Sequence, residues 1–229
     1  MLRYAVLGVI GLVAGSAWAQ SAPPPAEPTA APTKPPSGIV SMEEPRPGDH
    51  WTYQVRDEIT GKVGDTREHV ITEVTAKNIS LRIKTVESSK EGFNVYDRSW
   101  NLLSNPNWRY SPYQGSTGIR APLEVGNSWT FQSNNTNSNN GSIWKESGIS
   151  KVVGQETVTT RAGTFDAFKI ETSFSIQNVK DVTKKNEVVF QTWYAPAIDH
   201  WVKRITLSKV DKHVRTNETY ELIDYGRKQ

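Results

Sequence analysis

The side chains that could carry out catalysis are few and scattered along this chain. Its four histidines are His50, His69, His200 and His213. The adjacent residues Asp199 and His200 suggest a dyad, but neighbouring residues of a strand or turn tend to point apart. No Gly-x-Ser-x-Gly nucleophile elbow occurs in the sequence. These residues therefore predict no catalytic site. A hydrolase with an unrecognised site, built from carboxylates that meet only in the fold, stays open as an alternative.

Metal ligands are equally sparse. His200, Asp211 and His213 could converge if their strands pair, because residues at spacing two share one face of a strand. Lys209 and Lys212 lie close by and would oppose a bound cation. The sequence contains no His-x-x-x-His pair, EF-hand loop or phosphate-binding glycine loop. We therefore expect neither a metal nor a cofactor.

Aromatic side chains are the feature that does suggest a function. The chain has eight Trp and eight Tyr, and the stretch 99–115 (SWNLLSNPNWRYSPYQG) contains Trp100, Trp108, Tyr110 and Tyr113. Flat rings beside Asn and Arg can stack on sugars or line a groove. We predict these aromatic residues, placed on a loop, as the ligand-binding residues. The alternative is that their rings cap the open end of a β core.

The elements that must position these residues have the pattern of strands. From Pro47 onward, β-branched and aromatic residues alternate with polar ones, and Gly, Asn and Pro interrupt them. The phrase RPGDHWTYQV at 46–55 returns as EVGNSWTFQS at 124–133, which indicates an internal repeat. The fold class expected is all-β, an antiparallel meander of two similar halves, 46–123 and 124–229, curved or closed in part into a barrel. Alternatively, the phrase is only a favourable way to begin a strand.

The alternation also predicts where the strands lie. They are expected over residues 51–58, 66–74, 79–86, 93–100, 129–133, 143–153, 156–160, 165–176, 187–194, 200–209 and 214–224. The Asn-rich and Ser-rich residues 134–142 predict a long hairpin tip. Ala162 and Gly163 predict a tight turn, since glycine tolerates positive φ. Pro196 should end a strand, because proline has no N–H to donate.

The beginning of the chain predicts export. Met1–Ala19 has the pattern of a secretory signal peptide, with Arg3, an apolar core and the cleavage site Ala17-Trp18-Ala19. Residues 20–45 hold most of the thirteen prolines and predict a disordered Pro/Ala-rich linker. A single β domain is expected over 46–229. The expected location is periplasmic or secreted, with no integral membrane segment after cleavage.

Composition excludes several classes of function. The chain has no cysteine, which excludes disulfides, thiolate catalysis and acylation as a bacterial lipoprotein. The formal net charge is only +3, and basic residues alternate with acidic ones. Such a charge distribution predicts no basic patch for binding nucleic acid.

Three motifs, in this order, resemble a group of bacterial exported β-rich domains of unknown function. They are Gly-Asp-x-Trp-x-Tyr at 48–53, AGTFDAFKI at 162–170 and WYAPAIDHWVK at 193–203. The resemblance covers residues 46–225 and implies a periplasmic location and an antiparallel sheet. The group usually has glycine where this chain has Asp199-His200, so this turn is expected to differ in shape. The resemblance implies no activity and no catalytic residues.

The sequence therefore favours a non-enzymatic exported envelope protein that binds an apolar or glycan-like ligand. Its expected partners are a lipid, a glycan or an envelope protein, and not nucleic acid. A structural or protein-interaction module of the envelope is the alternative, using the Pro-rich tail or a sheet edge to reach its partner.

Overall fold

The computed structural model describes residues 42–227. The predicted signal peptide and most of the predicted linker lie outside this range. Among the described residues, no helix combines the length and the apolar character needed to cross a membrane.

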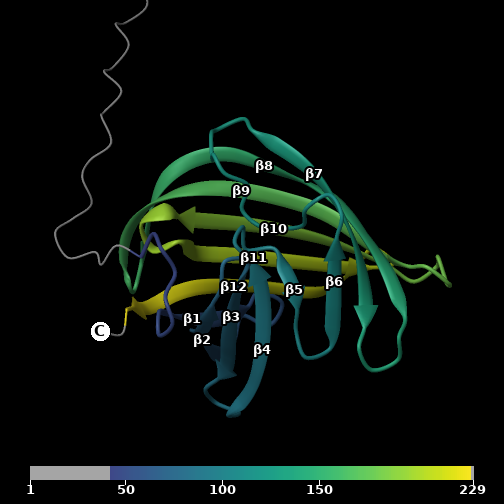
Figure 1. Ribbon diagram of the computed structural model, residues 1–229, viewed down its shortest axis with the longest axis horizontal. Helices are drawn as coiled ribbons and strands as arrows, with labels where there is room; N and C mark the ends of the chain where they lie inside the picture. The colour runs from purple at the N-terminus through teal and green to yellow at the C-terminus, as the bar shows by residue number, and fades with distance from the viewer. Residues whose placement is uncertain (1–41, 228–229) are drawn as a thin grey trace, which may run out of the picture. The chain divides into compact units, whose positions relative to one another are not determined.

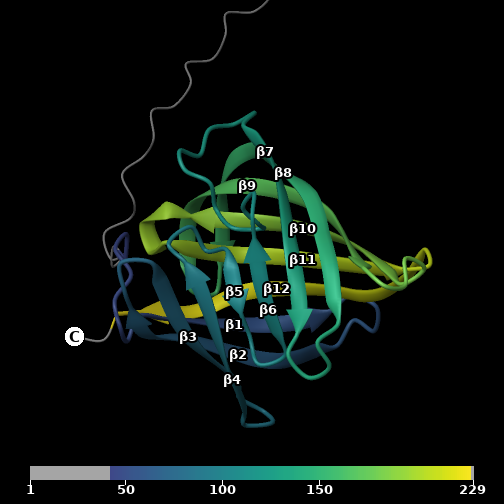
Figure 2. The ribbon, with the colours of Figure 1, turned by 45° about the vertical axis from the view of Figure 1, so that its right-hand side comes forward.

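The described chain forms one antiparallel sheet that closes into a barrel (Figure 1). Its strands are β1 (His50–Asp57), β2 (Val63–Val74), β3 (Asn78–Thr85), β4 (Lys90–Asp97), β5 (Leu102–Ser104), β6 (Trp108–Pro112), β7 (Ser128–Asn137), β8 (Ile143–Thr160), β9 (Gly163–Asn178), β10 (Lys185–Ala195), β11 (His200–Val210) and β12 (His213–Gly226). Each strand pairs with its neighbours in sequence, and β12 returns to pair with β1. The turned view shows the long strands β8–β12 curving around the interior (Figure 2). The predicted all-β antiparallel meander is thus confirmed, and the sheet closes completely.

The stretch predicted as an aromatic loop is the main local error. It contains two short strands, β5 and β6, which carry the sheet from β4 to β7. Two further predictions need correction. The segments 143–153 and 156–160 form the single strand β8, with a bulge beside Gly154, and β7 extends to Asn137 into the predicted hairpin tip. The short 3₁₀ helix Pro196–Ile198 follows β10, so Pro196 does end a strand.

The two copies of the repeated phrase adopt the same turn. Gly48 has φ 91° and donates its N–H to the carbonyl of Ile71 at 2.8 Å. Gly126 has φ 99° and donates to Val152, also at 2.8 Å. The aromatic residues that follow each glycine are buried. The phrase therefore begins β1 and β7 in the same way, while a duplication of the chain stays a prediction.

The main hydrophobic core joins side chains from β1, β2, β3, β9, β10, β11 and β12. Met42 belongs to this core and donates its N–H to the carbonyl of Ala197 at 2.8 Å, so packing begins before residue 46. The turn between β8 and β9 reaches β1 and β12, where Arg161 contacts Gln54 and Glu221. This core packs the strands on one side of a large interior space.

Candidate ligand cavity

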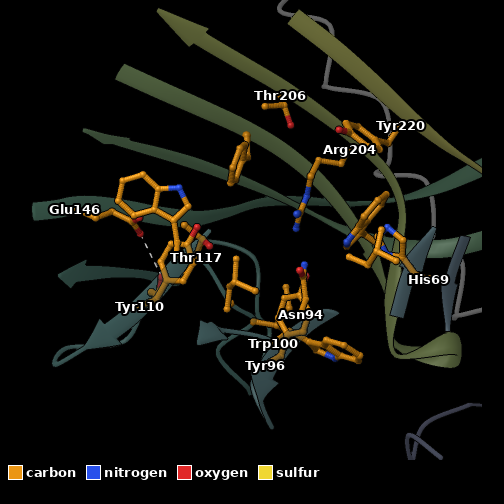
Figure 3. A pocket seen from close by; sticks show the side chains of 18 of the residues that line it. His69, Asn94, Tyr96, Trp100, Tyr110, Thr117, Glu146, Arg204, Thr206 and Tyr220 are labelled. Atoms are coloured by element: carbon orange, nitrogen blue, oxygen red, sulfur yellow. Dashed lines mark hydrogen bonds between the residues drawn. The ribbon is translucent and has the colours of Figure 1, made fainter. Parts of the chain in front are cut away.

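A cavity of about 680 Å³ lies within the barrel. Its lining residues come from β2 through β12, from the turn between β4 and β5, and from the segment that joins β6 to β7. The volume falls within the range of about 300–1,000 Å³ that is common for small-molecule sites. Rings and aliphatic side chains form much of the wall: Ile83, Tyr96, Trp100, Leu102, Trp108, Tyr110, Ile119, Trp144, Ile176, Phe190, Tyr194, Trp201 and Tyr220. Figure 3 shows side chains converging on this space from opposite strands.

The structure brings most of the predicted ligand-binding residues to this cavity. Trp100, Trp108 and Tyr110 line it. Tyr113 does not, because its side chain is largely exposed and its hydroxyl donates to Oε1 of Gln132 at 2.5 Å. The rings of Trp100, Trp108 and Tyr110 thus form part of the cavity wall.

Hydrogen bonds and ring contacts hold these aromatic residues in place. The Trp108 ring meets Trp144 edge to face, with centroids 6.3 Å apart. The Tyr110 hydroxyl accepts a hydrogen bond from Nδ2 of Asn105 at 3.2 Å. Burial raises the pKa of Tyr110 to about 12, so its phenol is neutral at ordinary pH. Edge-to-face pairs favour a fixed orientation of the rings, so this part of the wall is pre-formed.

Arg204 is one of the charged cavity residues that the sequence analysis did not predict. It projects from β11 toward the middle of the space (Figure 3). Its guanidinium carbon lies 4.9 Å from the Trp201 ring centroid and 5.3 Å from that of Phe190. Nε donates to Oγ1 of Thr192 at 3.1 Å. Within residues 42–227, no carboxylate forms an ion pair with Arg204. Burial lowers the pKa of Arg204, but a guanidinium keeps its charge in proteins.

A second cation, Arg67 on β2, lies at the same end of the cavity. Its Nη1 donates to the Tyr220 hydroxyl at 2.6 Å, and its guanidinium carbon is 5.1 Å from that ring centroid. The Tyr220 hydroxyl donates in turn to Oε2 of Glu218 at 2.8 Å. Arg67 is therefore connected to the Glu218 carboxylate through the Tyr220 hydroxyl. Within the described chain, Arg204 has no such connection.

A buried carboxyl group, Glu146 on β8, lies on the other side of the cavity from Arg204 (Figure 3). It accepts hydrogen bonds from Ser116 Oγ at 3.2 Å and from Asn135 Nδ2 at 2.9 Å. Asn135 also accepts a hydrogen bond from the buried Ser133 at 2.8 Å. Burial raises the pKa of Glu146, which favours the neutral acid. The side chains of this cluster therefore serve as hydrogen-bond partners for one another.

Asp199 and His200 do not form a dyad. Asp199 accepts hydrogen bonds from Tyr194 and Trp100, whereas Nδ1 of His200 accepts the backbone N–H of Trp201 at 2.9 Å. Burial depresses the pKa of His200 well below its usual value. The imidazole is therefore neutral and packs as a ring of the cavity wall.

The remaining histidines do not assemble a metal site. His200 begins β11, whereas Asp211 and His213 lie beyond its other end, so the convergence that we considered does not occur. His69 is buried in the wall, 6.1 Å from His200 between ring centroids. Across residues 42–227, no group of three His, Cys, Asp or Glu side chains is placed to hold a metal.

Comparisons with known proteins agree with the exported β-rich resemblance. Residues 120–216 match the DUF3108-like family. No curated protein matches the chain. The fold is similar to that of a candidate lipoprotein of Parabacteroides distasonis, with a TM-score of 0.52 and 12% identity over 82% of this chain and 99% of the other. It is also similar to a candidate exported protein of Bacteroides fragilis with a YmcC-like fold, with a TM-score of 0.50 and 14% identity over 82% of this chain and 100% of the other. At such identities the likeness is one of fold.

Proposed function

We propose that this protein is a non-enzymatic envelope protein that holds an apolar ligand inside its barrel. The observation that carries this proposal is the cavity of about 680 Å³ walled by Trp, Tyr, Phe and Ile side chains. Burying apolar surface contributes roughly 25 cal/mol per Å², so a ligand that fills such a space gains most of its affinity from contact with the wall.

Two observations support a periplasmic or secreted location. Met1–Ala19 has the pattern of a signal peptide, and two proteins of similar fold are described as a lipoprotein and an exported protein. This chain has no cysteine to carry a lipoprotein acyl group. We therefore propose a periplasmic or secreted location that does not depend on lipoprotein acylation.

The polar groups of the cavity favour an apolar ligand over a glycan. A sugar needs many free donors and acceptors around its hydroxyl groups, but Ser116, Asn135 and Glu146 are bonded to one another. Asn94 donates to the Tyr96 hydroxyl at 3.0 Å. A glycan would have to break these contacts, whereas an acyl chain or a ring system would leave them intact.

The alternative of a protein-interaction module has little free sheet edge to use. Adding a partner strand requires such an edge, and within residues 42–227 the closed sheet leaves only parts of strands unpaired on one side, such as the end of β8 beyond Lys151. The route through the Pro-rich segment 20–45 lies outside the described residues.

Titration with N-phenyl-1-naphthylamine, an uncharged probe that fluoresces in apolar surroundings, tests the proposal. We expect saturable binding to the wild type and at least about tenfold weaker binding to Thr206→Trp, which fills part of the cavity. Val189→Trp, at a position of β10 that is 37% exposed, is the matched control and should bind as the wild type does. A wild-type protein that leaves the probe fluorescence unchanged would overturn the proposal.

A further inference from the structure

We propose that the cavity ligand is an anionic amphiphile whose carboxylate or phosphate head binds Arg204. This inference rests on the proposed function, since it names the chemical class of ligand for the same cavity.

The first argument is the unbalanced charge of Arg204. Its guanidinium lies between the rings of Phe190 and Trp201, and no carboxylate of the described chain pairs with it. Arg204 is only partly exposed, and a cation that is largely removed from water is costly unless an opposite charge or hydrogen bonds compensate for it. An anionic ligand would supply the missing partner.

The second argument is the number of free donors. Arginine has five N–H groups, and the hydrogen bonds of Arg204 within residues 42–227 use only Nε. Its Nη groups therefore remain available on the cavity side. Because a guanidinium presents parallel N–H groups, it matches the two oxygens of a carboxylate or phosphate.

The third argument is the arrangement of neighbouring groups. The Arg204 guanidinium lies over Trp201, and the Trp201 ring contacts Tyr220 with centroids 5.8 Å apart. Tyr220 in turn binds Arg67. Two cations thus act on the same end of the cavity, while Tyr220 links only Arg67 to Glu218. The positive potential at this end favours an anion there.

The rest of the cavity sets the position of the tail. Trp108 and Trp144 pack against each other on the wall away from Arg204, beside Glu146. This region offers rings and a carboxyl group whose pKa is raised by burial, and among the described lining residues it offers no cation. An acyl chain fits here, with its head at Arg204, and the reverse orientation would place the anionic head away from both arginines.

Competition for the bound naphthylamine probe tests this inference. Four competitors share a twelve-carbon tail and differ in their heads: laurate, dodecyl phosphate, dodecanol and dodecyltrimethylammonium. At pH 7.5 each is used below its critical micelle concentration or, for dodecanol, below its solubility limit. We expect laurate or dodecyl phosphate to displace the probe at concentrations about tenfold or more below that of dodecanol, since hydrogen bonds to charged groups are among the stronger ones. Whichever of the two anions competes better identifies the carboxylate or the phosphate as the head.

Variants of Arg204 then test whether this residue causes the preference for an anionic competitor. Arg204→Gln should abolish the preference for laurate or dodecyl phosphate over dodecanol, measured as a ratio within each variant, and Arg204→Lys should retain part of the preference. Arg82→Gln is the matched control, because Arg82 is partly exposed on β3 and pairs with Glu91 at 3.2 Å. Equal competition by laurate, dodecyl phosphate and dodecanol in the wild type would overturn the inference, even if Arg204→Gln fails to fold. An unchanged anion preference in folded Arg204→Gln would overturn it as well. Failure of the wild type to bind the probe at all would instead overturn the proposed function.

Discussion

The indole nitrogen of Trp100 donates a hydrogen bond to Oδ1 of Asp199 at 3.1 Å, and both residues have left-handed backbone conformations, with φ 58° and 45°. The Tyr194 hydroxyl donates to the same oxygen at 2.5 Å. This contact joins the turn after β4 to the turn before β11, so that it fixes two sides of the cavity wall. Asp199 suits this position, because aspartate tolerates this conformation better than most residues and its side chain here accepts two hydrogen bonds.

Removing the Asp199 carboxyl should therefore destabilise the fold. We expect Asp199→Ala to lower the free energy of unfolding by about 1–3 kcal/mol, because two partly buried donors lose their acceptor. Asp199→Asn keeps an oxygen acceptor and tolerates positive φ, so its loss should be below about 1 kcal/mol. Urea denaturation followed by tryptophan fluorescence measures both variants. Equal stability of the two would contradict the role given to this side chain.

Protonation of His69 should weaken the fold in acid. Burial lowers its pKa from 6.5 to about 3, so the unfolded chain takes up this proton first as the pH falls. The stabilising contribution of neutral His69 is fully present above pH 6.5 and is lost as the pH falls from there to about 3. In this range the free energy of unfolding decreases by up to about 1.4 kcal/mol per pH unit. His69→Phe should reduce this slope, although His200, also neutral through burial, keeps its own contribution. The check is a series of urea denaturations from pH 7.5 to 4. Parallel pH profiles for the wild type and the variant would show that His69 does not carry the effect.

Two glycines of β8 should respond in opposite ways to alanine. A Cβ at Gly148 would lie 2.5 Å from the Ser173 carbonyl and 2.7 Å from Cζ of Phe131, and it would also overlap Phe174. Overpacking of this kind costs about 1–3 kcal/mol. A Cβ at Gly154 meets nothing within 4 Å, so Gly154→Ala should be neutral or stabilise the fold by up to about 1 kcal/mol. Thermal unfolding of the two variants provides the comparison. If Gly148→Ala and Gly154→Ala unfold at the same temperature, the packing around Phe131 is not as described.

Much of the fold could be predicted from the sequence because strand alternation is a local property. Most strands follow from it, and the glycine of each repeated phrase marks the turn before a strand. The short strands β5 and β6 escaped detection because Pro106 and Pro112 interrupt a stretch that is too brief to show a period. Alternation within β6 does explain why Trp108 and Tyr110 line the cavity and Tyr113 does not. Trp108 and Tyr110 share the inward face, whereas Tyr113 lies beyond the end of the strand.

The inward position of Arg204 could not have been predicted, because a bulge changes which side chains of β11 point into the barrel. Trp201 pairs with Tyr194 and Lys203 pairs with Trp193, so Val202 is an extra residue between them. Strict alternation from Trp201 would turn Lys203 inward and Arg204 outward. With the bulge, Arg204 faces the cavity and the ammonium of Lys203 lies 4.9 Å from the Trp193 ring centroid. Such a change of register leaves no mark in a single sequence.

Native mass spectrometry of the protein purified from the periplasm under mild conditions tests the central claim most directly. The wild type should carry an additional mass that denaturation releases and organic extraction recovers. Thr206→Trp should carry clearly less of this mass, and Val189→Trp should carry as much of it as the wild type. A wild-type protein at its bare polypeptide mass, or an identical adduct on folded Thr206→Trp, would contradict a ligand held inside the barrel.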